Sequence, residues 1–215
     1  MDNYRLIEKK LEAFIRKYYL NELLRGAIAF VTIGLAYFLI TVSFEYFFWL
    51  GTTLRSILFW LFIIVEAALF LRFIALPLTR LLKLSKGIDY FQASEIIGKH
   101  FPEVDDKLLN IIQLKQNDAG SDLILASINQ KSQKLKPVPF SIAVNFKSNL
   151  KYLKYAAIPV LVVLAIYISG NSSLFSDGYS RVVNYDEEYT PPAPFQFQVL
   201  NSSLKAQEDK NFVLK

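Results

Sequence analysis

The sequence predicts a membrane protein that is mainly α-helical, with three transmembrane helices, a cytoplasmic helical bundle and the start of an extracytoplasmic β domain. Three observations lead to this prediction. Hydrophobic residues make up 53% of the 215-residue chain and gather in three long apolar runs. Lys and Arg concentrate in the segments beside these runs, on one side of the expected membrane. A short alternation of apolar and polar residues near the C-terminus is typical of a β-strand.

The overall composition excludes several classes of protein. The chain has no Cys, one His, 15% aromatic and 20% charged residues, which is incompatible with a disulfide scaffold, a collagen or a disordered chain. The net charge of +5 could indicate a nucleic-acid partner, but the cations are spread along helices that adjoin apolar runs. We therefore expect these basic residues to face the lipid bilayer and expect no nucleic-acid partner.

Residues 1–25 have the pattern of one amphipathic helix. Ile7, Leu11, Phe14 and Tyr18 follow one another at spacings of four, three and four, with basic residues at other positions. This apolar stripe needs a cover. It could lie on the inner leaflet, pack on the chain's own cytoplasmic segment, or form a surface for a partner helix or a second copy.

Residues 26–79 predict a transmembrane hairpin. Gly26 to Phe44 is a run of nineteen residues without a charge, and such a helix is about 28 Å long, close to the thickness of the bilayer core. Ile57 to Leu78 is a second apolar run, interrupted by charge only at Glu66 and Arg72. The short connection between them is rich in aromatic residues, as expected where a hairpin turns at the headgroups.

Glu66 is the most informative polar residue of the predicted spans. It lies near the middle of the second span, where an ionised carboxylate costs about 3 kcal/mol. We expect it to face protein, with Thr32, Thr41 and Ser43 of the first span, or groups of another subunit, as candidate contacts. It could join helices, carry a proton or ion, or simply be tolerated.

Residues 80–139 predict a cytoplasmic module of three helices, Tyr90 to His100, Val104 to Gln116 and Asp122 to Leu135. Pro102 disfavours helical geometry at the residue before it, and the segment 118–121 separates the second helix from the third. The whole cytoplasmic segment 80–154, with about 75 residues, can build a marginal core of its own, helped by the N-terminal helix.

Residues 140–169 predict one long helix that is amphipathic at first and fully apolar later, with its transmembrane part near Tyr155 to Ser169. Lys147, Lys151 and Lys154 recur at spacings of four and three, which places them on one face of that helix. At the inner headgroup level they would contact anionic lipid, as an anchor or as a regulated switch.

Residues 170–215 predict an extracytoplasmic linker and the first strands of a β domain. An acidic, proline-rich spacer precedes Phe195, Phe197 and Val199, which alternate with glutamines. Two strands alone do not make a stable sheet in water. We therefore expect either a longer protein that continues the β domain or a partner that supplies the remaining strands.

The distribution of cations predicts the orientation. Lys and Arg number six in residues 1–25 and twelve in residues 80–154, against Arg55 alone in the first hairpin loop. The positive-inside rule then puts the N-terminus and the module in the cytoplasm and the C-terminus outside, with the protein crossing the membrane several times.

The sequence contains no motif for catalysis. It lacks a glycine-rich phosphate loop, a zinc-protease HExxH motif and any Cys. We therefore expect no enzymatic activity, no catalytic residue, no cofactor, no metal and no small-molecule substrate.

The stretch from Ala93 to Leu114 resembles the N-terminal region of large uncharacterised bacterial inner-membrane proteins, which form a domain-of-unknown-function family. The shared pattern runs from Ile-Gly through His-x-Pro and Asp-x-Leu-Leu-Asn to Gln-Leu, and is matched by Ile97, Gly98, His100, Pro102, Asp106, Leu108, Leu109, Asn110, Gln113 and Leu114. The resemblance implies a long periplasmic continuation with β domains and coiled-coil segments. It implies no catalytic residue.

Together these patterns favour a non-enzymatic anchor or scaffold subunit that holds a larger periplasmic part at the inner membrane, within an envelope complex. Protein partners or a homo-oligomer are expected. The first alternative is a transport or proton-coupling subunit that uses Glu66 within an oligomer. The second is a membrane sensor whose cytoplasmic bundle binds a protein.

Overall fold

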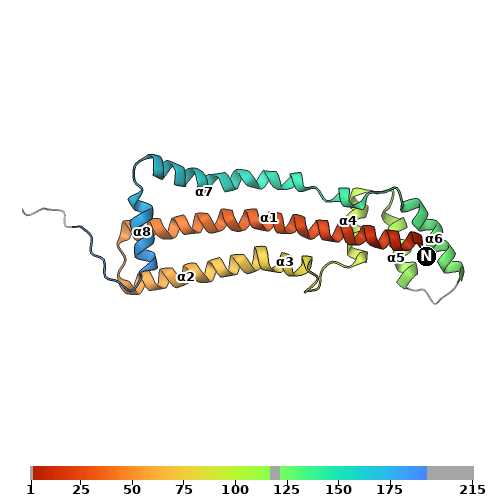
Figure 1. Cartoon of the computed structure of the whole chain (residues 1–215), viewed down its shortest axis with the longest axis horizontal. Helices are drawn as coiled ribbons and strands as arrows, with labels where there is room; N and C mark the ends of the chain where they lie inside the picture. The colour runs from red at the N-terminus through yellow and green to blue at the C-terminus, as the bar shows by residue number, and fades with distance from the viewer. Residues whose placement is uncertain (1, 117–121, 193–215) are drawn as a thin grey trace, which may run out of the picture.

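The computed structural model describes residues 2–116 and 122–192, and every regular element within these ranges is helical. The molecule is elongated, with the first helix as its long axis (Figure 1). In chain order the elements are α1 (Asp2–Phe48), α2 (Thr52–Phe70), η1 (Leu71–Ala75), α3 (Leu76–Leu81), α4 (Tyr90–His100), α5 (Asp105–Gln116), α6 (Asp122–Leu135), η2 (Phe140–Ala143), η3 (Phe146–Asn149), α7 (Leu150–Ile168) and α8 (Ser173–Val183). The strands predicted around Phe195 lie outside the described residues.

Three helical segments are long and apolar enough to cross a membrane, as the sequence predicts. They are Asn3–Phe48, Thr52–Leu81 and Phe140–Ile168. In the second segment no residue of the most apolar stretch is buried within the chain, and large apolar side chains such as Ile57, Leu61 and Ile64 are exposed. Such a surface is unfavourable in water and suits the hydrocarbon core of a bilayer, which indicates that the protein associates with a membrane.

Helix α1 is one continuous helix of 47 residues, about 70 Å long. The sequence predicts an amphipathic helix that ends near Arg25, followed by a separate span. The structure has no break there, because residues 2–48 contain no proline and the glycine at Gly26 costs only about 1 kcal/mol. The N-terminal part of α1 therefore projects along the axis of the span instead of turning onto a membrane surface.

Helices α1 and α2 form an antiparallel hairpin with a regular register (Figure 1). Each step along α1 is matched by an almost equal step along α2, as two straight helices with the same rise per residue require. Contacts of α1 with α2 at successive levels are Glu45 with Arg55, Phe38 with Phe62, Gly34 with Glu66 and Phe30 with Phe70, and Gly26 with Phe73 of η1 follows.

The second apolar segment changes its winding near its end. Pro77 has no N–H group, so the Phe73 carbonyl four residues earlier loses its usual helical donor. The turn Leu71–Ala75 is wound as a π-helix, in which the Leu76 N–H group donates to the Leu71 carbonyl. Gly26 of α1 packs directly on the Phe73 carbonyl, where a Cβ atom would lie only 2.1 Å from its oxygen. Only glycine permits this close approach of the two backbones.

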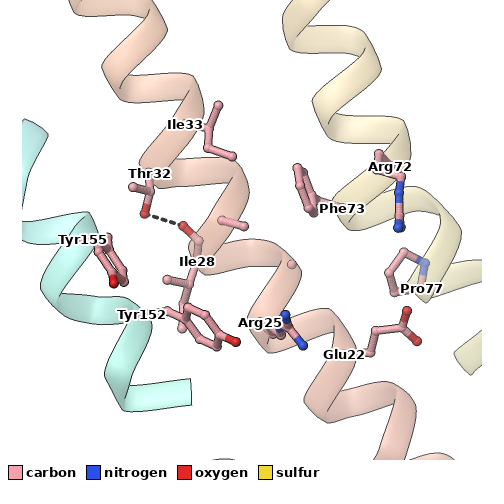
Figure 2. A pocket seen from close by; sticks show the side chains of 12 residues that line it. Glu22, Arg25, Ile28, Thr32, Ile33, Arg72, Phe73, Pro77, Tyr152 and Tyr155 are labelled. Carbon is pink, nitrogen blue, oxygen red and sulfur yellow. Dashed lines mark hydrogen bonds between the residues drawn. The ribbon is translucent and has the colours of Figure 1, made fainter. Parts of the chain in front are cut away.

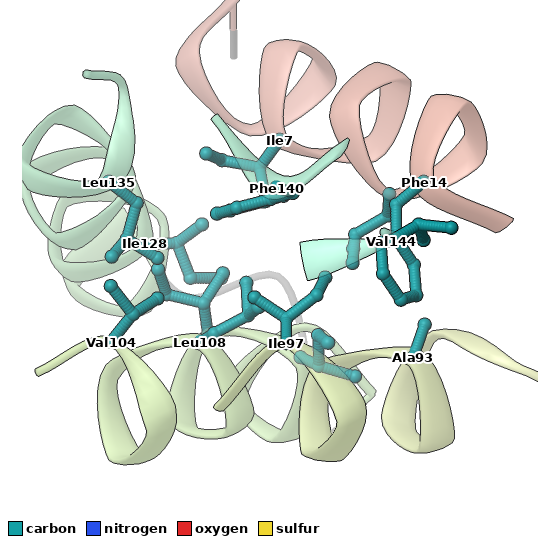
Figure 3. Close-up of a cluster of buried hydrophobic side chains, with 13 residues drawn as sticks. Ile7, Phe14, Ala93, Ile97, Val104, Leu108, Ile128, Leu135, Phe140 and Val144 are labelled. Atoms are coloured by element: carbon teal, nitrogen blue, oxygen red, sulfur yellow. The ribbon is translucent and has the colours of Figure 1, made fainter. Parts of the chain in front are cut away.

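The N-terminal part of α1 completes a helical bundle with α4, α5, α6 and η2. We call this region the bundle end of the molecule. The expected helices 90–100 and 122–135 are present with these bounds, and the middle helix begins at Asp105. Figure 3 shows Ile7, Phe14 and Phe140 facing Ile97 and Leu108 across the core. All five side chains are fully buried, so the bundle core depends on residues more than 100 positions apart.

The segment 140–169 is not the single long helix that the sequence predicts. Residues before Leu150 form two short 3-10 turns, and only α7 is a regular helix. Phe140 is drawn into the bundle core, and the Asn145 side chain accepts a hydrogen bond from the Lys147 N–H group at the second turn. The chain therefore stays with the bundle until Leu150, where α7 begins and runs beside α1 (Figure 1).

Helix α8 is not predicted from the sequence. It crosses the far ends of α1 and α2, and we call this region the α8 end (Figure 1). Its buried residues are Leu174, Gly178, Arg181 and Val182. Their spacing of four, three and one is that of a helical face, but the polar residues and the glycine within it hide the pattern from a hydrophobicity argument.

Candidate functional site

Polar side chains on the hairpin occupy three levels along its axis. The first level is at the α8 end, where Arg55 and Glu45 form a fully buried ion pair with 3.0 Å between Nε and Oε1. Both side chains have no exposed surface. Desolvation of two charges is offset only when further hydrogen bonds satisfy them. Arg55 has these, whereas the second carboxylate oxygen of Glu45, Oε2, is buried without a hydrogen-bond partner among the described residues.

The Arg55 guanidinium binds three parts of the chain. Besides Glu45 of α1, it donates to the Leu50 carbonyl in the hairpin turn at 2.5 Å and to the Glu187 carbonyl at 2.6 Å. Its face also lies 4.8 Å from the centre of the Tyr189 ring. We call this set of contacts the Arg55 clamp. It fixes the segment after α8 to the turn of the hairpin.

A second arginine holds α8 in place. Arg181 is buried and lies 3.8 Å from the centre of the Trp49 ring and 5.6 Å from that of Tyr46. Gly178 packs on α1, where a Cβ atom would come within 2.8 Å of the Val42 carbonyl oxygen. Cation–π contacts and close backbone packing thus dock α8 on the end of α1.

The second level is the middle of the spans, where Glu66 faces α1. A Cβ atom on Gly34 would lie 2.9 and 3.1 Å from the two carboxylate oxygens, so Gly34 provides the space that the carboxylate fills. Oxygen Oε1 is buried and has no hydrogen-bond partner among the described residues. A buried polar group without a partner on an apolar helix is costly, and Glu66 is therefore a candidate functional residue.

The threonines expected near Glu66 do not bind it. The Thr32 hydroxyl donates to the Ile28 carbonyl of its own helix at 2.6 Å. The Thr41 hydroxyl is buried without a partner among the described residues, and it lies about 10 Å further along α1 than Gly34. The structure therefore places Glu66 against α1, as expected, but does not bring these three side chains together.

The third level is at the bundle side of the spans and contains a groove of about 420 Å³. Figure 2 shows Arg25 on α1, Arg72 and Pro77 on one side, and Tyr152 and Tyr155 of α7 on the other. The Arg25 guanidinium lies 5.0 Å from the centre of the Tyr152 ring. We call this feature the Arg25–Arg72 groove.

The lysines predicted to contact lipid headgroups are all exposed. Lys151 and Lys154 belong to α7, and their ammonium groups lie over the rings of Tyr152 and Tyr155 at 5.1 and 5.0 Å. Lys147 belongs to the 3-10 turn before α7. The predicted placement on one face of a single helix therefore holds for Lys151 and Lys154 but not for Lys147.

The stripe proposed as a partner surface is part of the core. Ile7, Leu11 and Phe14 are at most 1% exposed, and Tyr18 packs against the same core. Of the covers considered from the sequence, the chain's own bundle is the one that the structure contains. These side chains are therefore not available to a partner helix.

The sequence analysis did not identify Arg55 and Arg181 as the residues that hold α8 and the segment after it. It also did not place Arg25 and Arg72 in one groove. One signal was present: Arg55 follows Glu45 by ten residues around a predicted hairpin turn, which puts opposite charges at the same level on two helices. The sequence matches no known family model, and comparisons with curated proteins and with solved structures give no significant match. No group of three His, Asp or Glu residues that could hold a metal ion occurs within residues 2–116 and 122–192.

The Arg55 clamp predicts a strong and non-additive response to mutation. Arg55→Leu should lower the free energy of unfolding by about 3 to 5 kcal/mol, because Glu45 would remain buried without its partner. The double variant Glu45→Leu with Arg55→Leu should lose less than the sum of the single losses. Equilibrium unfolding in mixed SDS micelles measures these values.

The matched control for this cycle is Arg80→Leu. Arg80 pairs with Glu22 at 3.6 Å, but both side chains are about one-third exposed. Its loss should change the free energy of unfolding by about 1 kcal/mol or less. Equal effects of Arg55→Leu and Arg80→Leu would contradict the assignment of the clamp.

Proposed function

We propose that this protein is a non-enzymatic membrane anchor that holds extramembrane segments in a fixed position at the two faces of a bacterial inner membrane, as a subunit of an envelope complex. The observation that supports this most directly is the Arg55 clamp. It binds the chain at Glu187, where the polypeptide leaves α8 toward its C-terminal segment. A subunit that only inserted helices into lipid would not need to fasten this exit point with a buried charge.

The continuity of α1 supports the same proposal. One helix contributes Ile7, Leu11 and Phe14 to the bundle core at one end and Glu45 to the clamp at the other. Because α1 is one unbroken helix, it joins the bundle core to the α8 end without an intervening loop. The protein would thus act as a stiff connector between two compartments.

The charge distribution supports the orientation of this anchor. Residues 1–25 and 80–154 carry eighteen Lys and Arg between them. These two segments contain the bundle end and the adjoining parts of α1, α3 and α7. The positive-inside rule places that end in the cytoplasm and α8 in the periplasm.

A second candidate function, proton coupling, is favoured by one observation. Glu66 has a buried carboxylate oxygen with no hydrogen-bond partner among the described residues. An intramembrane carboxylate of this kind can bind and release a proton. Three spans are few for an independent transporter, so this function would require several copies of the chain.

The anchor proposal predicts a fixed distance across the clamp. The chain has no Cys, so two spin labels can be placed at the exposed residues Leu54 and Glu188 without a background. Pulsed electron paramagnetic resonance should give one narrow distance distribution, because the segment after α8 is held at Glu187 and Tyr189. Arg55→Leu and the milder Tyr189→Ala should broaden it, and Arg80→Leu should not.

Two results would contradict the anchor proposal. The first is a broad distribution in the parent protein, which would mean that the exit segment is not held. The second is proton flux in liposomes containing the purified chain that Glu66→Gln abolishes while the protein still assembles. That result would support proton coupling instead.

The orientation has its own test. A reporter enzyme that is active only in the periplasm should be silent when fused after Gln116 and active when fused after Ser176, because these positions lie on opposite sides of the third span. A cytoplasm-active reporter at the same two positions serves as the control. The reverse pattern would overturn the orientation.

A further inference from the structure

The two ends of the hairpin balance their charges in different ways. At the α8 end Glu45 and Arg55 neutralise each other. At the bundle side of the spans the corresponding charges are Arg25 on α1 and Arg72 on η1, which are both positive and both line the same groove. Arg25 lies about 30 Å from Glu45 along α1, and Arg72 about 25 Å from Arg55 along α2, close to the thickness of a bilayer core.

Neither guanidinium of the groove is neutralised by the described part of the chain. No ion pair of Arg25 or Arg72 occurs within residues 2–116 and 122–192. Glu22 also lines the groove, but its carboxylate is 3.6 Å from Arg80. Arg25 and Arg72 instead lie over the rings of Tyr152 and Phe73, at 5.0 and 6.0 Å from the ring centres. The groove therefore has an excess of positive charge.

The groove also has an apolar half. Beyond the arginines, its surface is formed by Ile28, Ala29 and Ile33 of α1, which continue toward the middle of the span. Tyr152 and Tyr155 bound it on the α7 side, with the ammonium groups of Lys151 and Lys154 over their rings. A ligand that fits this surface has an anionic head at the level of the arginines and a hydrocarbon chain that extends into the bilayer.

We propose that the Arg25–Arg72 groove binds one anionic phospholipid of the bundle-side leaflet. The phosphate is held by the two guanidiniums, and an acyl chain lies on α1 between α7 and the η1–α3 segment. Guanidinium groups suit this role because they bind phosphate oxygens in a bidentate manner, and basic pockets between membrane helices are typical sites for anionic headgroups.

Two features of the fold bring the two arginines to the same groove. The π-helical turn Leu71–Ala75 carries Arg72 itself, and Gly26 lets the backbone of α1 approach that of Phe73 closely. Residues Arg25 and Arg72 therefore lie beside the tightest contact between the two helices. A bound lipid would join α1, η1 and α7 at a level where the described residues form no ion pair among these three elements.

Native mass spectrometry of the detergent-purified 215-residue chain tests this proposal. The chain is titrated with phosphatidylglycerol, with phosphatidylcholine of the same acyl chains, and with glycerol phosphate, which has the anionic head and no chain. We expect one phosphatidylglycerol to be retained in preference to phosphatidylcholine, and glycerol phosphate to bind much more weakly. Arg25→Gln and Arg72→Gln should each weaken phosphatidylglycerol binding by about fivefold.

Two further variants separate a built site from general attraction to a basic surface. Arg16→Gln removes the same charge from an exposed position on α1 outside the groove, and should weaken binding by less than about twofold. Ala29→Trp keeps every charge but fills the apolar half of the groove, and should abolish retention. Circular dichroism and elution volume show whether each variant is folded, and since Arg72 is exposed, Arg72→Gln carries the test if Arg25→Gln misfolds.

Four results would overturn the proposal. Unchanged binding in Arg25→Gln and Arg72→Gln would exclude the guanidiniums, and unchanged binding in Ala29→Trp would exclude the groove. An equal loss in Arg16→Gln would reduce the effect to diffuse electrostatic attraction. Glycerol phosphate that binds as tightly as phosphatidylglycerol would identify a site for a soluble anion instead of a lipid.

Discussion

The register between α1 and α2 is the constraint on which the rest of the structure depends, and the buried Glu45–Arg55 pair sets it. A shift of one turn would leave both charges buried without a partner, which is far more costly than the loss of any apolar contact between the helices. With this level fixed, equal rise along both helices brings Gly34 to Glu66 and Gly26 to Phe73. The mid-membrane carboxylate and the two-arginine groove are consequences of that single alignment.

The second determinant is that α1 does not end with its apolar part. Because the helix runs on from the span into the bundle, the same element supplies the stripe Ile7, Leu11 and Phe14 that the short helices α4, α5 and α6 need to complete their core. Without this stripe, segment 80–154, about 75 residues long, would bury only a marginal core. The bundle is thereby coupled to the apolar span by one continuous helix.

The sequence was sufficient for features that depend on local pattern. Charge-free length predicted the spans, and helical spacing with flanking breakers predicted Tyr90–His100 and Asp122–Leu135. It was not sufficient where distant residues decide. Helix α1 continues through Arg25 because no proline or other helix-breaking residue ends it there. Phe140 lies outside the helix predicted for residues 140–169 because its ring is buried in the bundle core. The contacts of Arg55 and Arg72 could be recognised only from the hairpin register. It places Glu45 beside Arg55 and Arg25 at the level of Arg72.

Disulfide trapping tests this register most directly, because the chain has no Cys of its own. The ring centres of Phe30 and Phe70 are 6.0 Å apart across the hairpin, whereas Ile63 lies two helical turns away from Phe70, about 10 Å along α2. With this register, Phe30→Cys with Phe70→Cys should form a disulfide in membranes, and Phe30→Cys with Ile63→Cys should not. Equal or faster crosslinking of the second pair would contradict it.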